Sequence, residues 1–157
     1  MPTLKFIDQD GLLNWLEDLG IDHYLCGQCS GVHISETQSQ VGVLESRVFL
    51  EQDCLIFTSE IDIRNSTLLA VNAELARLNG TFANLKFFLD LSDEGPARLI
   101  ICDTQWVSAG ISREQVGVFL RSAIEAKLDV LSELVDCHFI ESTESRSDSL
   151  RSDPSLH

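Results

Sequence analysis

Two thiols and two imidazoles lie within eleven residues near the start of this 157-residue sequence. The segment reads His23-Tyr24-Leu25-Cys26-Gly27-Gln28-Cys29-Ser30-Gly31-Val32-His33. Thiolate sulfur and imidazole nitrogen suit the tetrahedral preference of Zn²⁺, and a Cys-x-x-Cys turn can supply two of its four ligands. Cys26, Cys29, His33 and His23 are therefore the candidate metal ligands.

This segment is only half of a structural zinc motif. Most such sites add a second, distant ligand pair, and the sequence holds no other Cys-x-x-Cys. We therefore expect no bound metal or other cofactor. In this interpretation the two cysteines are simply small residues at a bend between strands, and His33 lies on a strand face. A thioredoxin-like role would need Cys26 at a helix N-terminus, where the dipole lowers a thiol pKa. Residues 30–34 do not resemble a helix start, which disfavours redox catalysis.

Other catalytic signatures are missing from the sequence. It contains no Gly-x-Ser-x-Gly, no phosphate-binding loop ending in Lys-Ser/Thr, no His-Glu-x-x-His and no dinucleotide fingerprint. Neighbouring acids such as Glu17-Asp18, Asp93-Glu94 and Glu60/Asp62 fall at a predicted helix end, a turn and a strand face, where solvated carboxylates are expected. We predict no catalytic residues and no enzymatic activity.

The elements that must position these side chains follow from hydrophobic periodicity. The first helix has Asp10 as its expected N-cap and Gly20 as its stop. A second is capped by Asn65 or Ser66 and ended by Asn79-Gly80, and a third opens on a Ser112/Gln115 capping box. The predicted order is a helix over 10–20, a strand over roughly 23–34 that is interrupted at Gly27 and Gly31, strands over 42–50 and 54–63, a helix from about 65 to 80, strands over 85–91 and 98–106, and a helix over 112–135.

The second and third strands alternate as a hairpin with one buried face should. In the second strand the even positions are apolar: Leu44, Val48 and Leu50. In the third strand the odd positions are apolar: Leu55, Phe57, Ile61 and Ile63. Residues 85–91 alternate similarly before a turn at 92–96. Short connections between these strands predict a mostly antiparallel sheet, so the fold class is α+β. The apolar third helix and the Ala-rich second helix have surplus surface for a partner.

Composition excludes several classes of partner. The chain has 25 Asp plus Glu against 11 Lys plus Arg, a net charge of −14, and 44% hydrophobic residues. Binding to nucleic acid or to an anionic membrane depends on basic residues, so both are disfavoured. Residues 141–157 are Ser-rich with four acids and two bases, and we expect a disordered tail there. The single domain over residues 1–140 thus carries −12 of the net charge.

The sequence also predicts a compartment. No apolar run approaches the roughly 20 residues that cross a bilayer, and the N-terminus lacks the apolar stretch of a secretory signal. Five cysteines are an odd number in such a chain, which favours reduced thiols over a disulfide framework. We expect a cytoplasmic protein.

Several segments, taken in order from about residue 10 to residue 136, resemble the YbjN family of enterobacterial proteins, described as sensory transduction regulators. Their shared order and spacing carry the resemblance. The segments are Trp15-Leu16-Glu17-Asp18-Leu19-Gly20, Cys26-Gly27-Gln28-Cys29 with Val32-His33-Ile34, Leu55-Ile56-Phe57, Phe88-Leu89-Asp90, Leu99-Ile100-Ile101-Cys102, and Gly110-Ile111-Ser112 leading to Gln115.

The resemblance implies a fold similar to class I type III secretion chaperones, in which a helix, three strands, a helix, two strands and a helix follow one another. It further implies a homodimeric, non-enzymatic regulator that acts through protein contacts on exopolysaccharide production, motility, stress response and virulence. It offers no catalytic residues. The alternative from another class is a small zinc or thiol-redox protein that uses Cys26, Cys29, His33 and His23.

Overall fold

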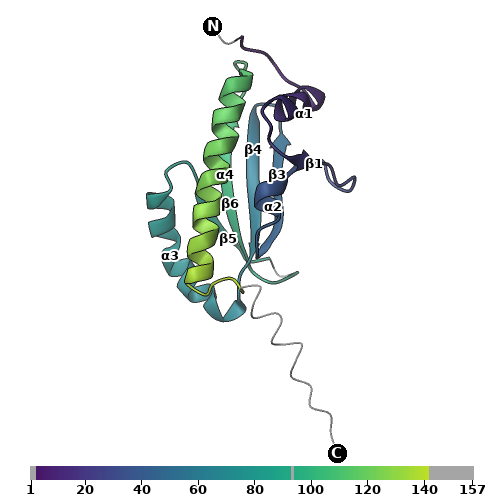
Figure 1. Cartoon of the computed structure of the whole chain (residues 1–157). Helices are drawn as coiled ribbons and strands as arrows, with labels where there is room; N and C mark the ends of the chain where they lie inside the picture. The colour runs from purple at the N-terminus through teal and green to yellow at the C-terminus, as the bar shows by residue number, and fades with distance from the viewer. Residues whose placement is uncertain (1–2, 93, 142–157) are drawn as a thin grey trace, which may run out of the picture.

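A six-stranded antiparallel sheet forms the centre of the computed structural model, which describes residues 3–92 and 94–141 (Figure 1). The strand order is β1-β2-β3-β4-β6-β5. The elements are α1 (Gln9–Asp18), β1 (His23–Tyr24), β2 (Val32–Ile34), α2 (Ser35–Gln38), β3 (Val43–Leu50), β4 (Cys54–Asp62), the 3₁₀ turn η1 (Asn65–Thr67), α3 (Leu68–Thr81), β5 (Lys86–Asp90), β6 (Arg98–Trp106) and α4 (Arg113–Asp136).

The predicted α+β class with an antiparallel sheet is confirmed, but the predicted element order is wrong in one place. The segment 23–34 is not one strand. It is a hairpin of two short strands, because Gly27 with φ of 75° and the residues around it form a loop between β1 and β2. The short helix α2, which follows β2 directly, was not predicted because one helical turn leaves no periodic signal.

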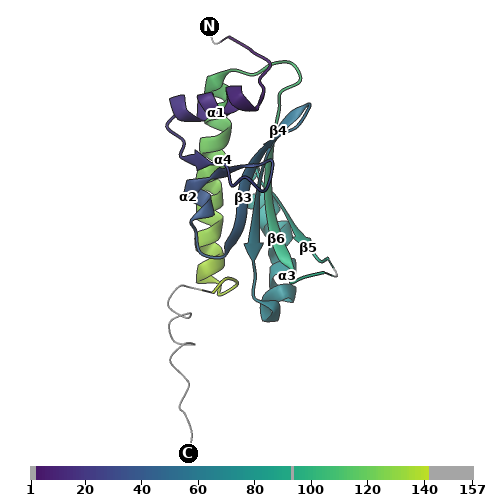
Figure 2. The same cartoon turned by 90° about the vertical axis from the view of Figure 1, so that its right-hand side faces the viewer.

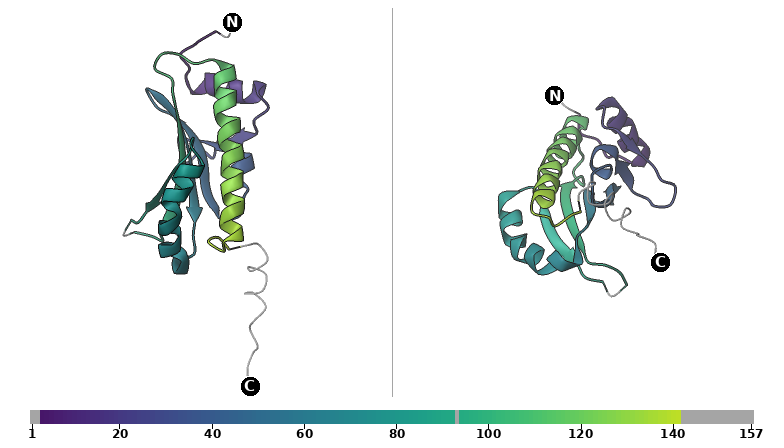
Figure 3. Two further views of the ribbon diagram at one scale, coloured as in Figure 1. Left: turned by 90° about the vertical axis from the view of Figure 1, so that its left-hand side faces the viewer. Right: turned by 60° about the horizontal axis from the view of Figure 1, so that its bottom comes forward.

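Helices cover one face of the sheet (Figure 2). The inward alternation predicted for β4 is confirmed, since Leu55, Phe57 and Ile61 are fully buried. One half of the core lies between α1, the first half of α4 and the sheet, and the other half lies between α3, the second half of α4 and the sheet. Figure 3 shows α3 beside α4. The core therefore occupies the helical side of the sheet, and none of the helices in the described residues lies on the opposite side.

The predicted inward position of Leu44 is wrong. The register of β3 against β4 shifts between Val43 and Glu45, which is a β-bulge. Because a bulge inserts one residue, it reverses the alternation before it, so Val43 packs on the core and Leu44 is exposed. Leu91 is also exposed, since β5 ends at Asp90.

The helix ends are only partly as predicted. The capping box of α4 is confirmed, because the Ser112 hydroxyl accepts from the Gln115 backbone and the Gln115 side chain accepts from the Ser112 backbone. The N-cap of α1 is Asp8 instead of Asp10, since the Asp8 carboxylate accepts from the Gly11 N–H at 2.8 Å. Neither Asn65 nor Ser66 caps α3: they begin a 3₁₀ turn, and α3 starts at Leu68.

Asn79 does not end α3, which continues to Thr81. Its side-chain amide donates to the Phe87 carbonyl at 3.0 Å and accepts from the Phe87 N–H at 2.9 Å. These two bonds occupy the outward N–H and carbonyl of Phe87 in the edge strand β5, which would otherwise be open to pairing with another strand. A residue predicted as a helix stop thus protects the edge of the sheet.

Some predictions fall outside the described residues. These are the tail beyond Glu141 and Asp93 in the turn over residues 92–96. Among the helices of the described chain, none is both long and apolar enough to span a bilayer.

Candidate functional site

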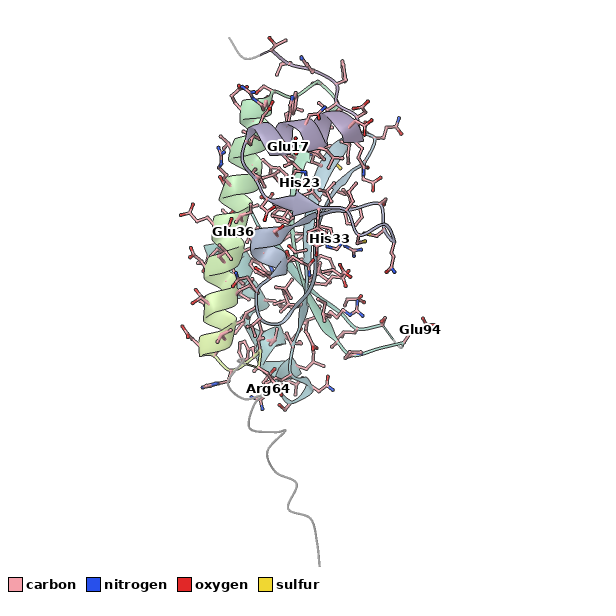
Figure 4. All side chains as sticks on the ribbon, turned by 45° about the vertical axis from the view of Figure 1, so that its right-hand side comes forward. Glu17, His23, His33, Glu36, Arg64 and Glu94 are labelled. Atoms are coloured by element: carbon pink, nitrogen blue, oxygen red, sulfur yellow. The ribbon has the colours of Figure 1, made fainter. Side chains whose placement is uncertain are left out.

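The hairpin of β1 and β2 holds the thiols and imidazoles that the sequence singles out. Tyr24 pairs with His33 and His23 pairs with Ile34, so both histidines lie on neighbouring strands (Figure 4). The loop between these strands closes over β3. A Cβ built on Gly31 would lie 3.0 Å from side-chain atoms of Arg47 and Phe49, which only glycine avoids.

The loop brings three of the four candidate ligands together. The Cys26 and Cys29 sulfurs are 3.3 Å apart, and the Cys29 sulfur is 3.6 Å from His33 Nε2. The three ligand atoms all lie within 4.8 Å of one another. His23 does not join this group: its Nδ1 lies 2.8 Å from the carbonyl oxygen of Ile21, which precedes β1.

His33 is held in place by a hydrogen-bond partner and by a stacked ring. Its Nδ1 lies 2.9 Å from the amide oxygen Oε1 of Gln38 in α2, and Tyr24 stacks on its ring with 4.7 Å between centroids. The same Gln38 oxygen accepts from the Ser46 N–H, and the Gln38 amide donates to the Leu44 carbonyl. Because Gln38 Oε1 accepts the Nδ1 hydrogen, Nε2 keeps its lone pair toward Cys29.

The local hydrogen bonds favour the charged form of the Cys26 thiol. The Gln28 backbone N–H, with the side chains of Cys29 and His33, lowers the pKa of Cys26 to about 6. Burial acts to lower the pKa of His33, but its hydrogen bonds to Gln38, Cys26 and Cys29 raise it on balance. The Cys26 thiol therefore ionises readily near neutral pH beside the His33 ring, which suits metal binding or thiol chemistry.

Lys127 is a buried polar residue that sequence reasoning missed. It lies within the apolar stripe of α4 with 0% of its surface exposed. Its ammonium donates to the Phe57 carbonyl at 3.0 Å, to the Ser59 hydroxyl at 2.8 Å and to the Ile101 carbonyl at 3.3 Å. Burial lowers the pKa of Lys127 to about 7.

A chain of hydroxyls extends from Lys127 across the core. The Ser59 and Ser46 hydroxyl oxygens are 2.8 Å apart, and those of Ser46 and Thr37 are 2.7 Å apart. The alternation of β4 could have revealed these hydroxyls from the sequence, because Ser59 occupies an inward position between Phe57 and Ile61. A polar residue at an inward position needs a buried partner.

The sheet face without helices carries apolar side chains that alternate with the core residues. We call this surface the open face. Neighbouring pairs on it are Phe49 with Ile56, Ile100 with Phe88, and Cys54 with Trp106. Phe88 is 41% and Trp106 68% exposed. Partner surface was predicted on the helices, where Val118 of α4 and Leu69 of α3 are exposed, and the open face adds further exposed apolar side chains.

Ion pairs cross the open face. Glu60 accepts from Arg47 at 3.0 Å and from Arg98 at 2.6 Å. Lys86 lies over the Phe88 ring at 5.6 Å. The basic side chains named on this face are therefore each engaged with Glu60 or with an aromatic ring. Of the carboxylate pairs in the sequence, Glu17 and Asp18 are exposed at the end of α1, as predicted.

Comparison with known proteins decides the family. The sequence profile of the YbjN family, described as "Putative bacterial sensory transduction regulator", matches residues 8–135. The chain belongs to the YbjN family. It is 30% identical over 125 residues to the YbjN proteins of Escherichia coli (strain K12) and Shigella flexneri, covering 80% of this chain and 79% of each relative.

A solved structure extends the YbjN similarity to the fold. The structure titled "Crystal structure of YbjN, a putative transcription regulator from E. coli" matches with a TM-score of 0.84 and 28% sequence identity. The match covers 90% of this chain and 100% of that one. The mixed architecture of helices on an antiparallel sheet is thus shared with YbjN, and the family is one described as regulatory.

Proposed function

We propose that this YbjN-family chain is a non-enzymatic regulator that acts in the cytoplasm by binding another protein through its open face. The observation that carries the proposal is the apolar, partly exposed sheet surface that no helix covers. Exposed apolar and aromatic side chains on an uncovered sheet face are a feature of protein contact surfaces. Its aromatic members, Phe88 and Trp106, belong to the residue types that dominate binding energy.

Charge supports a protein partner over a nucleic acid. The net charge of −14 repels phosphate, and the basic side chains of the open face are already engaged with Glu60 or an aromatic ring. The acidic surface around the open face favours a partner with an apolar centre and a basic rim. The same charge limits nonspecific association of the protein with itself.

The resemblance suggests the process that is regulated. We propose negative regulation of exopolysaccharide production, with effects on motility, stress response and virulence, by a homodimer whose fold is similar to class I type III secretion chaperones. A true chaperone role is a variant of this proposal. It requires an extended secreted substrate bound to the surface, and recovery of regulatory proteins without any secreted substrate would argue for regulation.

Crosslinking in cells, followed by affinity purification and mass spectrometry, tests the open face. The variant is Phe88→Ser with Trp106→Ser, and the control is Leu69→Ser, which removes an 84% exposed apolar side chain from α3. Loss of a hot spot costs about 2 kcal/mol or more, so we expect at least a roughly 30-fold loss of partner affinity in the double variant alone.

Two results would contradict the proposal. One is the absence of any protein enriched over a charge-matched acidic control. The other is equal recovery of the partner by wild type and the double variant, provided that circular dichroism shows both to be folded.

A further inference from the structure

We propose that Cys26, Cys29 and His33 bind one Zn²⁺ ion. The inference is independent of the open-face proposal, because its ligands come from the β1–β2 hairpin and it needs no partner protein. The ion is placed by the side chains that the loop brings together, and water completes its coordination on the exposed side of Cys26.

The spacing of the ligand atoms fits a tetrahedral ion. Zinc bonds of about 2.3 Å to sulfur and about 2.0–2.1 Å to nitrogen place neighbouring tetrahedral ligands roughly 3.4–3.8 Å apart. The Cys29 sulfur is 3.6 Å from His33 Nε2, within this range, and 3.3 Å from the Cys26 sulfur, slightly below it. Binding would therefore require the exposed Cys26 side chain to move its sulfur slightly away from that of Cys29.

The groups around the ligands are those that zinc sites use. A zinc-bound histidine generally donates its second ring N–H to a carbonyl or carboxylate, and His33 Nδ1 faces Gln38 Oε1 at 2.9 Å. The Gln28 backbone N–H points to the Cys26 sulfur at 3.4 Å. Gly27, with φ of 75°, permits the tight turn between the two cysteines.

Ligand chemistry selects zinc. Two thiolates balance the charge of a divalent ion, and sulfur with imidazole nitrogen disfavours Mg²⁺ and Ca²⁺, which prefer oxygen. The site has three protein ligands, so it is incomplete by the standard of a structural Cys₂His₂ site. That leaves one position for water.

A zinc titration of the reduced full-length chain tests the site. Thiols are first counted to verify that all five are free, and zinc is then titrated against a chromophoric chelator under nitrogen. We expect one Zn²⁺ per chain. Gln38→Ala removes a hydrogen-bond partner of a ligand and should lower zinc affinity roughly 10–100-fold. The Cys26→Ser/Cys29→Ser variant removes two ligands and should lower zinc affinity by more than that. Cys137→Ser, which removes an exposed thiol remote from the hairpin, is the matched control and should bind as wild type does.

Cobalt provides a second readout that does not depend on affinity. Co²⁺ in the wild type should give a thiolate-to-metal charge-transfer band, and the double cysteine variant should lack it. Zinc should also raise the unfolding temperature of the wild type and leave that of the folded double variant unchanged. The proposal is overturned if fully reduced wild type binds no zinc, if it forms only a Cys26–Cys29 disulfide with no metal-bound state, or if Cys137→Ser loses binding as the double variant does.

Discussion

Lys127 is the residue whose environment departs most from its sequence pattern. Within the described residues its buried ammonium contacts three hydrogen-bond acceptors but no carboxylate. The ammonium of Lys127 has three donors, and Phe57, Ser59 and Ile101 supply three acceptors. It also lies 3.6 Å from the centre of the Phe57 ring. These contacts offset part of the cost of taking the charge out of water, which explains how α4 tolerates it.

The buried lysine should make stability depend on pH. Burial lowers the pKa of Lys127 from 10.5 to about 7, so between about pH 7 and pH 10 the unfolded chain holds a proton that the folded chain releases. The free energy of unfolding should therefore rise with pH across this window, by at most about 1.4 kcal/mol per pH unit, and the cost of burying the charge is fully present below pH 7.

Urea unfolding at pH 7, 8 and 9 measures this slope. Lys127→Met keeps the aliphatic chain and should remove the contribution of Lys127 to it, whereas Lys86→Met changes an exposed lysine and should follow the wild type. Parallel stability curves for wild type and Lys127→Met would contradict the assignment.

At the scale of the residue, sequence found the thiol cluster but not its surroundings. The spacing of Cys26, Cys29 and His33 was visible because the three residues are close in the chain. Gln38 and Arg47, which contact the group, come from α2 and β3, and pairing of β2 with β3 brings Arg47 opposite His33. Lys127 was hidden because a lysine on a helix is ordinarily read as surface.

At the scale of the element, Gly42 allows the turn before β3 to pack closely against the segment that follows α4. Gly42 has φ of 79°, and a Cβ built on it would lie 2.3 Å from Ile140 Cγ2. Its carbonyl accepts from the Asp62 N–H at 2.8 Å. The segment after α4 therefore packs directly on the turn before β3.

Gly42→Ala should be strongly destabilising. Positive φ costs a non-glycine residue roughly 1–2 kcal/mol, and the contact with Ile140 adds about 1–3 kcal/mol of overpacking. Gly80→Ala is the matched control, since no atom lies within 4 Å of its built Cβ and it occupies a helical position in α3. The control should gain up to about 1 kcal/mol. Denaturant unfolding measures the stability of both variants. If Gly42→Ala were as stable as Gly80→Ala, the prediction would be wrong and the turn before β3 would relax freely.

Periodic elements were predictable and aperiodic ones were not. The α4 stripe and the β4 alternation follow from the repeat of a helix and of a strand, and both are confirmed. The Leu44 bulge, the one-turn helix α2 and the division of residues 23–34 each change the pattern over one to four residues, which is too short for periodicity to detect.

At the scale of the whole molecule, charge controls association. Monomers with a net charge of −14 repel one another, and the predicted homodimer must bury apolar surface in spite of this repulsion. Salt screens such repulsion, so the dimer should tighten as ionic strength rises.

Light scattering at micromolar protein measures the dimer directly. We expect a mass of twice the 17.5 kDa of the chain, with the dimer fraction increasing between low and moderate salt. A mass that stays at 17.5 kDa at both ionic strengths would contradict the homodimer.

The sequence by itself determined the α+β class, the acidic charge and the candidate ligands Cys26, Cys29, His33 and His23, because composition, periodicity and close spacing are local properties of the chain. The order and spacing of short segments carried the family resemblance. Only the tertiary structure decided the open face, the burial of Lys127 and the use of Asn79 at the β5 edge. Each depends on which face of the sheet the helices cover, and that is set by contacts between residues far apart in the sequence.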